Sequence, residues 1–352
     1  MASSTRSTLG AEVAGLGNGA GSVEPVRSTD LAIIGAGPTG LYAAYYAGFR
    51  GLSTVIIDSL EEPGGQVTAL YPEKPIYDVA GFPSVLGKDL VAGCVAQADA
   101  FDPTYLLGHR AEQLVRTDPD DERSPLRVTT HRGEVVEARA VLIAGGIGTF
   151  APRPLPGSDL WEGRGLLYFV RDLGALRDHR VLIVGGGDSA VDWALALEDL
   201  ARSVTLIHRR EGFRAHEGSM KRLHASGVDI RVHHEVRRIE GGDRLERAVI
   251  FDNRTDEEAV IEVDTVVAAL GFTADLGPLR SWDIDHDGRR IRTDSRCATS
   301  MPGVYAAGDV VDYPGKVPLI ATGFGEAATA VNNAAVWLDP DARLMAGHSS
   351  DA

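Results

Sequence analysis

The sequence predicts an α/β fold in which two domains built on parallel sheets share one chain, the second inserted into the first. Three observations support this prediction. Two glycine-rich turns, 35–40 and 185–190, each follow a short apolar segment and precede a helical one, and a second apolar segment closes each unit. A segment at 304–309 then resumes the pattern of the first unit. Strand–turn–helix–strand units of about 30 residues are typical of dinucleotide-binding, Rossmann-like domains.

The first unit is preceded by a segment without regular pattern. The first 27 residues are rich in Gly, Ala and Ser, and no basic stretch leads into an apolar one. We therefore expect a disordered tail at 1–27 and no signal peptide. A strand is predicted over 31–34, a helix over 41–48 and a second strand over 54–57.

The turn of the first unit reads Gly35-Ala-Gly-Pro-Thr-Gly40. In this pattern Gly35 permits the tight turn, Gly37 lets a pyrophosphate approach the backbone, and Gly40 allows close helix packing. Thr39 lies within the same turn, and the helix N-terminus behind it suits an anion. Asp58 follows Gly35 by 23 residues, where a carboxylate accepts hydrogen bonds from ribose hydroxyls.

The second unit repeats this order. A strand is predicted over 180–184, a helix over 191–200 and a strand over 204–207. The turn between them has the form G-x-G-x-x-A, and its predicted nucleotide-binding residues are Gly185, Gly187, Asp188 and Ser189. Asp188 and Ser189 are expected to shape the helix N-terminus. His208 follows Gly185 by the same 23 residues, so one chain carries two nucleotide sites.

The two sites differ where the ribose would lie. Asp58 suits a free 2′-hydroxyl, as in FAD or NAD, and would repel a 2′-phosphate. The second site has cationic groups instead, namely His208, Arg209, Arg210 and Arg214. Arginine forks bind phosphate oxygens in pairs, so the second site is predicted to prefer NADPH over NADH. The alternative interpretation is a solvated basic loop.

The composition excludes several classes of protein. The 352 residues include 35 Lys and Arg against 50 Asp and Glu, a formal net charge of −15, which argues against nucleic acid or an anionic membrane as partner. No apolar run approaches the ~20 residues of a membrane span. Cys94 and Cys297 form neither a C-x-x-C motif nor a metal-ligand spacing. We therefore expect buried thiols, no metal, and a reducing, cytoplasmic setting.

The domain boundaries follow from the segments between the units. A strand over 138–144 leads into the Pro-rich stretch 151–156, which is expected to be a stiff connector without helix. A strand over 265–270 ends at Gly271, before the first pattern resumes. The prediction is a nucleotide domain at 151–271, inserted between 28–150 and 272–352. The linkers near Phe150 and Gly271 would act as a hinge.

This domain order resembles the low-molecular-weight thioredoxin reductases, with the chain matching over about 29–352. Those enzymes carry a redox C-x-x-C before the second glycine-rich strand, whereas here the stretch Tyr168-Phe-Val-Arg-Asp172 has no cysteine. The sequence more closely resembles the thioredoxin-reductase-type ferredoxin–NADP reductases. The shared stretches are Ala69-Leu-Tyr-Pro-Glu-Lys74, Tyr77-Asp-Val-Ala-Gly-Phe-Pro83, Gly187-Asp-Ser-Ala-Val-Asp-Trp193, His208-Arg-Arg-Glu-Gly-Phe-Arg-Ala-His-Glu217, Gly323-Phe-Gly-Glu326 and Val331-Asn-Asn-Ala334.

The resemblance implies FAD at the first site. It places Tyr71 on one face of the flavin ring system, and a flat aromatic ring suits that position. Gln66 would hydrogen-bond the flavin pyrimidine or ribitol. Asp309 would lie at the ribitol and phosphate, with a helix N-cap as its alternative or additional role. Phe150 matches a position beside the flavin, and Ala111 matches one where the backbone meets the adenine.

The resemblance also concerns the C-terminal end. It implies a tail that crosses to a partner subunit and covers the second flavin face, which makes the protein a homodimer. His348 matches the covering residue, and Ser350 matches a flavin contact. Both residues lie close to Ala352, the last residue.

The implied activity is FAD-dependent electron transfer between NADPH and ferredoxin or a similar iron–sulfur or flavodoxin carrier. NADPH would give a hydride to flavin N5, and single electrons would leave without a dithiol. An acidic carrier requires a local basic docking patch, for which Lys74, Arg153 and Lys316 are candidates. Two rivals stay open: a flavin reductase for quinones or other diffusible acceptors, and a redox sensor that binds a partner when reduced. The missing C-x-x-C opposes thioredoxin reduction.

Overall fold

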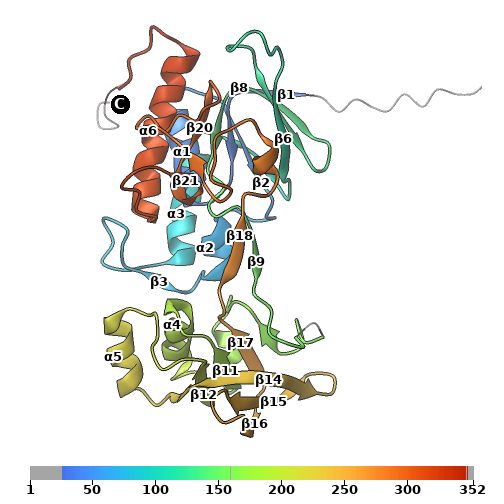
Figure 1. Ribbon diagram of the computed structural model, residues 1–352. Coiled ribbons are helices and arrows are strands. Elements are labelled where there is room, and N and C mark those ends of the chain that lie inside the picture. The colour runs from blue at the N-terminus through green and yellow to red at the C-terminus, as the bar shows by residue number, and fades with distance from the viewer. Residues whose placement is uncertain (1–25, 159, 346, 348–352) are drawn as a thin grey trace, which may run out of the picture.

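The computed structural model describes residues 26–158, 160–345 and 347, so most of the predicted tail lies outside the described part. A seven-stranded sheet forms the upper half of the molecule (Figure 1), in the order β5-β2-β1-β8-β7-β6 with β20 also paired to β8. Its strands are β1 (Arg27–Ile34), β2 (Thr54–Asp58), β5 (Thr104–Leu107), β6 (Ala111–Arg116), β7 (Leu126–Thr130), β8 (Val135–Ile143) and β20 (Val304–Ala306). Strand β20 returns from late in the chain to pair in parallel with β8, as the resumed pattern predicts.

Side chains of β1 alternate between two cores, because neighbouring residues of a strand face opposite sides of the sheet. Leu31 and Ile33 lie in the core that the helices cover, whereas Ala32 and Ile34 lie in the core on the other face. The helices of this half are α1 (Pro38–Phe49), α2 (Gly65–Leu70), α3 (Gly87–Asp99) and α6 (Ile320–Leu338). Helix α1 packs between α3 and α6, so the first glycine turn lies where the helical layer meets the sheet.

The lower half contains a sheet whose strands all pair in parallel, in the order β10-β17-β11-β12-β13. In the first sheet, by contrast, β7 pairs antiparallel with both β6 and β8. The strands of the second sheet are β10 (Leu166–Leu167), β11 (Arg180–Val184), β12 (Ser203–His208), β13 (Asp229–Val232) and β17 (Thr265–Ala268). Val181 and Ile183 face helix α4 (Asp188–Leu197), which packs beside α5 (Glu217–Ala225). Leu182 and Val184 face the other way, into the core shared with the strands described next.

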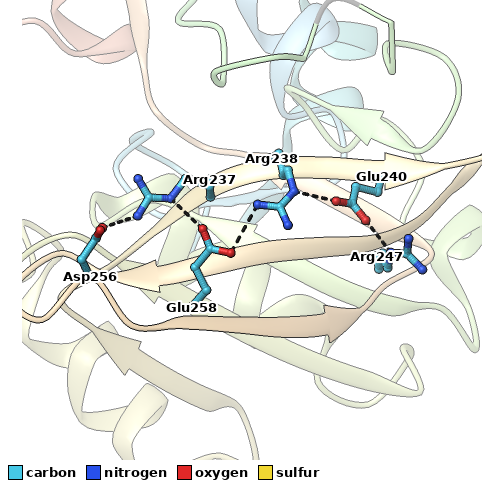
Figure 2. A network of polar contacts seen from close by, with 6 residues as sticks. All are labelled: Arg237, Arg238, Glu240, Arg247, Asp256 and Glu258. Atoms are coloured by element: carbon cyan, nitrogen blue, oxygen red, sulfur yellow. Dashed lines mark hydrogen bonds and ion pairs between the residues drawn. The ribbon is translucent and has the colours of Figure 1, made fainter.

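A three-stranded antiparallel sheet covers that second face. It consists of β14 (His234–Gly241), β15 (Leu245–Asp252) and β16 (Glu258–Glu262). Figure 2 shows the ion pairs along its charged face, where Glu258 lies 3.2 Å from Arg237 Nε and 3.3 Å from Arg238, and Glu240 lies 2.6 Å from both Arg238 and Arg247. Asp256 also pairs with Arg237. These partly exposed pairs contribute little energy individually. Glu240–Arg247 joins the neighbouring strands β14 and β15, and Glu258 links β16 to β14.

The two halves are joined by an antiparallel ribbon of β9 (Thr149–Pro152) and β18 (Phe272–Asp275) (Figure 1). Arg153 N also donates to Gly271 O at 3.0 Å. The connector at 151–156 contains no helix, as predicted, and its first two residues belong to β9. Pro152 ends β9, and a proline is tolerated at the end of an edge strand because no donor is required there. The fold as a whole is the predicted two-domain, Rossmann-type arrangement.

The remaining elements are short. They are the strands β3 (Pro75–Ile76), β4 (Val85–Leu86), β19 (Ile291–Arg292) and β21 (Val311–Asp312), and the 3-10 turns η1 (Gly174–Leu176), η2 (Gly277–Ser281) and η3 (Gly308–Val310). Both glycine-turn helices start earlier than predicted. Helix α1 begins at Pro38, because a proline's fixed φ and missing donor suit the first helical position. Within the described ranges, none of the helices combines the length and apolar character that crossing a bilayer requires.

Candidate functional site

The first glycine turn is packed on one side and open on the other. Gly35 has a φ of +113°, and a Cβ added there would overlap the carbonyl oxygen of Ala144. A Cβ on Gly40 would overlap the carbonyl oxygen of Gly35, so both positions require glycine. Gly37, the N-cap of α1, has no neighbouring heavy atom within 4 Å of an added Cβ. The turn therefore leaves free space in front of the helix N-terminus.

Asp58 ends β2 and holds this turn. Its Oδ2 accepts from Ala36 N at 2.6 Å, and its Oδ1 accepts from Leu60 N at 2.8 Å. Burial raises the pKa of the Asp58 carboxyl, against the effect of these two backbone donors. Each carboxylate oxygen has two acceptor positions, so capacity for a further donor remains. His109 N donates to Asp58 O at 2.8 Å, which brings the start of β6, including the buried Ala111, beside the same sheet edge.

Helix α2 lies against the first turn and carries two predicted residues. Gly64 N donates to Ala36 O at 2.8 Å, which ties the start of α2 to the turn. The Gln66 amide lies directly against Gly146. Tyr71 is the C-cap of α2 and packs against core residues of both halves. Burial, with the nearby charges of Asp309 and Asp78, raises the pKa of Tyr71 to about 12, so its hydroxyl stays protonated.

Asp309 is the middle residue of η3, and burial raises the pKa of its carboxyl. The helix N-cap alternative for Asp309 is wrong, since α6 starts at Ile320 and its N-cap is Leu319. Thr39 lies against Gly308, the residue before Asp309, so the first turn and η3 are in contact.

A buried glutamate, Glu326, holds η3 in place, and its role was not predicted from the sequence. Glu326 Oε2 accepts from Gly308 N at 2.7 Å, and its Oε1 accepts from Tyr313 OH at 2.6 Å and pairs with Lys316. The Lys316 side chain is only 2% exposed, so proposing it for a docking patch was wrong. Glu326 is the one charged residue in the 19-residue helix α6, and a lone acid among apolar residues was the available signal.

The second glycine turn has the same construction. A Cβ on Gly185 would overlap the carbonyl oxygen of Ala269, whereas Gly187, the N-cap of α4, faces open space. The His208 ring lies directly over Gly186, and its Nε2 lies 3.2 Å from Gly212 O. Burial, together with the three neighbouring arginines, lowers the pKa of His208, which favours the neutral imidazole.

One cavity of about 1650 Å³ connects residues predicted for the two sites. Gln66, Tyr71 and Asp309 line it from the first half. The second half contributes Gly185, Gly187, Asp188, Ser189, His208, Arg209, Arg210 and Arg214. The structure therefore brings three predicted FAD residues and all eight predicted NADPH residues to one space. Gly35, Gly37, Asp58 and Ala111 do not line this cavity and cluster at the first turn and its sheet edge.

Three predicted residues contribute less to this geometry. Phe150 lies on β9, opposite Ala274 in the ribbon. His348 and Ser350 lie outside the described residues.

The two thiols are both buried, and burial raises the pKa to about 11 for Cys94 and about 12 for Cys297, so neither is poised for thiolate chemistry.

Comparison with known proteins identifies the family. The family model described as pyridine nucleotide-disulphide oxidoreductase matches residues 29–334. A ferredoxin–NADP reductase of Salinispora arenicola is 58% identical over 326 residues, 93% of this chain and 99% of that protein. One of Thermus thermophilus is 53% identical over 329 residues, covering 92% and 97%.

Among solved structures, a thioredoxin reductase of T. acidophilum shares the fold with a TM-score of 0.76 at 25% identity, over 90% of this chain and 100% of that one. The thioredoxin reductase of Lactococcus lactis gives 0.74 at 25% identity, over 88% and 99%. The thioredoxin-reductase-like fold and the high identity to the first two relatives agree, and the chain belongs to the ferredoxin–NADP reductases within the pyridine nucleotide-disulphide oxidoreductase family.

Proposed function

We propose that this oxidoreductase binds FAD at the first glycine turn and NADPH at the second, and transfers electrons between NADPH and ferredoxin or a similar small carrier. The supporting observation is the single cavity that residues of both sites line. FAD, when bound, accepts two electrons from a nicotinamide and releases them one at a time. The protein contributes binding, orientation and exclusion of competing acceptors.

The residues around the first turn fit FAD. The open space at Gly37 lies at the N-terminus of α1, where a pyrophosphate is favoured by free backbone donors. Asp58 is held by Ala36 and Leu60 with acceptor capacity left for ribose hydroxyls. Tyr71 and Gln66 would contact the ring system, and Asp309 would contact the ribitol. Ala111 would meet the adenine, and Phe150 would lie near the flavin.

The residues around the second turn fit NADPH. Arg209, Arg210 and Arg214 are exposed at the cavity and can form paired hydrogen bonds with a 2′-phosphate. His208 lines the cavity beside these arginines. It packs over Gly186 and near the Phe213 ring, with centroids 5.0 Å apart, so it would support the loop while the arginines hold the phosphate.

The proposed domains are 28–150 with 272–352 for FAD, and 151–271 for NADPH, with the β9–β18 ribbon as the hinge. Contacts beside the ribbon would hold the present orientation. Lys74 pairs with Asp192 of α4, and Leu173 N donates to Glu73 Oε2 at 3.2 Å. Lys74 is therefore engaged between the halves, which leaves the exposed Arg153 as the remaining candidate for carrier docking.

The finer assignments belong to the same proposal. A homodimer would let the C-terminal residues His348 and Ser350 of one subunit cover the flavin of the other. Two separate buried thiols suit a reducing compartment, and we place the protein in the cytoplasm. Light scattering at micromolar concentration tests the dimer.

The decisive experiment uses the purified, FAD-loaded protein with NADPH, ferredoxin and cytochrome c as the final reporter. The proposal requires that cytochrome c reduction depend on ferredoxin. Its rate with ferredoxin must also exceed the rate at which NADPH is oxidised without ferredoxin. Equal rates with and without ferredoxin, combined with fast reduction of quinones, would identify a flavin reductase. Bound FAD that NADPH reduces once, without turnover on any carrier, would instead indicate a redox sensor.

A further inference from the structure

The arginines proposed to read the 2′-phosphate lie on a loop without regular secondary structure. Residues 209–216 connect β12 to α5, and within them only Arg214 forms a bridge, with Gly187. A guanidinium on a fixed backbone binds a phosphate more tightly, because a loose loop loses entropy when the ligand orders it. The groups that hold this loop therefore bear on selectivity.

Asn253 holds the first end of the loop. This residue lies in the turn after β15, and its Nδ2 donates to Arg209 O at 2.9 Å and to Glu235 Oε1 at 2.9 Å. Its own backbone N donates to His233 O at 2.8 Å, which fixes the turn itself. The three-stranded sheet thus holds the carbonyl of an arginine proposed to bind the nucleotide.

Asp188 holds the other end. Its Oδ1 accepts from His216 N at 2.9 Å, and between the two ends Arg214 N donates to Gly186 O at 2.7 Å. A carboxylate at the N-terminus of α4, beside the proposed pyrophosphate position, would by its charge alone oppose an anionic ligand. Its hydrogen bond to the loop adds a task to the nucleotide binding and the shaping of the helix N-terminus that the sequence predicted.

We propose that Asn253 and Asp188 are positioning residues that set the preference for a 2′-phosphate by fixing the two ends of loop 209–216, without contacting that phosphate themselves. The inference rests on the proposed function, since it assumes that this loop reads NADPH. It adds Asn253, which no sequence pattern indicated, and it assigns Asp188 a role through the loop.

The test is calorimetric titration of the FAD-loaded full chain with 2′,5′-ADP and with 5′-AMP, which differ only in the 2′-phosphate. The ratio of the two affinities should fall about three- to tenfold in Asn253→Ala and in Asp188→Ala, the range of one net hydrogen bond. Asp188→Asn should keep the ratio, because its amide oxygen still accepts from His216 N. In turnover of Asn253→Ala, the KM for NADPH should rise while kcat at saturation stays unchanged.

Glu211→Ala is the matched control. It removes a carboxylate from the same loop, and among the described residues that carboxylate accepts no hydrogen bond, so the ratio should not fall. If only the charge of Asp188 mattered, Asp188→Ala and Asp188→Asn would raise the affinity for both nucleotides by the same factor. Asn253→Ala would then keep the wild-type affinities. That result would overturn the inference. A wild-type ratio near one would refute the NADPH site itself, whereas a high wild-type ratio that both alanine variants keep would refute only the positioning role.

Discussion

Replacing Lys316 with methionine should destabilise the protein strongly. The Lys316 and Glu326 side chains are 2% and 7% exposed, so the change leaves a carboxylate buried without its cation. Removing one partner of such a pair typically costs about 3–5 kcal/mol. Glu326 keeps two hydrogen-bond donors, Gly308 N and Tyr313 OH. Because they still stabilise the carboxylate, we expect a loss of unfolding free energy near the lower end of this range, about 3 kcal/mol.

The second change, Glu326→Gln, tests the cause. In the double variant no buried charge remains, and the glutamine oxygen still accepts one of the two hydrogen bonds. The double variant should therefore recover at least about 1.5 kcal/mol of the loss caused by Lys316→Met alone. Urea unfolding of the FAD-loaded protein, followed by tryptophan fluorescence, measures the four proteins under one condition.

FAD affinity provides an independent readout, because Gly308 precedes Asp309 in η3 and Glu326 holds the Gly308 amide. Loss of FAD should accompany Lys316→Met and be smaller in the double variant. A cost below about 1 kcal/mol for Lys316→Met, or a double variant less stable than the single one, would refute the reasoning about the buried pair.

Three further predictions concern the cofactor, the thiols and pH. Arg209→Ala should reduce the preference for NADPH over NADH about tenfold, mainly through a higher KM for NADPH, because one lost contact is worth ~1.4 kcal/mol. An unchanged ratio of kcat/KM for the two nucleotides in steady-state kinetics would contradict this. A Cys94→Ala, Cys297→Ala double variant should keep ferredoxin reduction per bound FAD, and loss of that activity in a folded, FAD-loaded protein would mean that a thiol carries electrons. The hydrogen bond and charge of Arg180 lower the pKa of Asp264 to about 2. The ion pair of Asp264 with Arg180 therefore stabilises the fold fully above about pH 4, and this stabilisation is lost as the pH falls through about 2. Because the pair is partly exposed, Asp264→Asn should cost less than about 1 kcal/mol at pH 7 and progressively less toward pH 2 in pH-dependent unfolding; a cost independent of pH would exclude the ion pair as its source.

Short sequence patterns predicted the strands and turns whose structure depends on neighbouring residues in the chain. The strands 31–34 and 180–184 are apolar runs followed by glycine turns, and both were found inside their sheets, paired in parallel with both neighbours. The sheet of β14, β15 and β16 was not predicted, because charged residues interrupt its apolar alternation and several of them pair across strands. Cross-strand partners far apart in the chain leave no periodic signal.

The candidate site divides in the same way. Gly37 and Gly187 were found as open helix N-termini, since the motif itself encodes that geometry. The tasks of Glu326 and Asn253 depend on which backbone groups the folded chain brings to them, at separations of 18 and 44 residues. No spacing rule reports such contacts, and Lys316 was misjudged as a surface cation for the same reason.

The ribbon of β9 and β18 also bears on how the molecule can be divided. Pro152 and Phe272 are paired across it, so the chain leaves the first half and returns to it at adjacent points. Paired strands lie about 5 Å apart, a gap that a few residues can close. Replacing 153–271 with a short glycine linker would interrupt no strand of the seven-stranded sheet. A single excision in the gene would thus remove the second half and leave every strand of the seven-stranded sheet in place, and a single insertion at the same point would attach a different domain there.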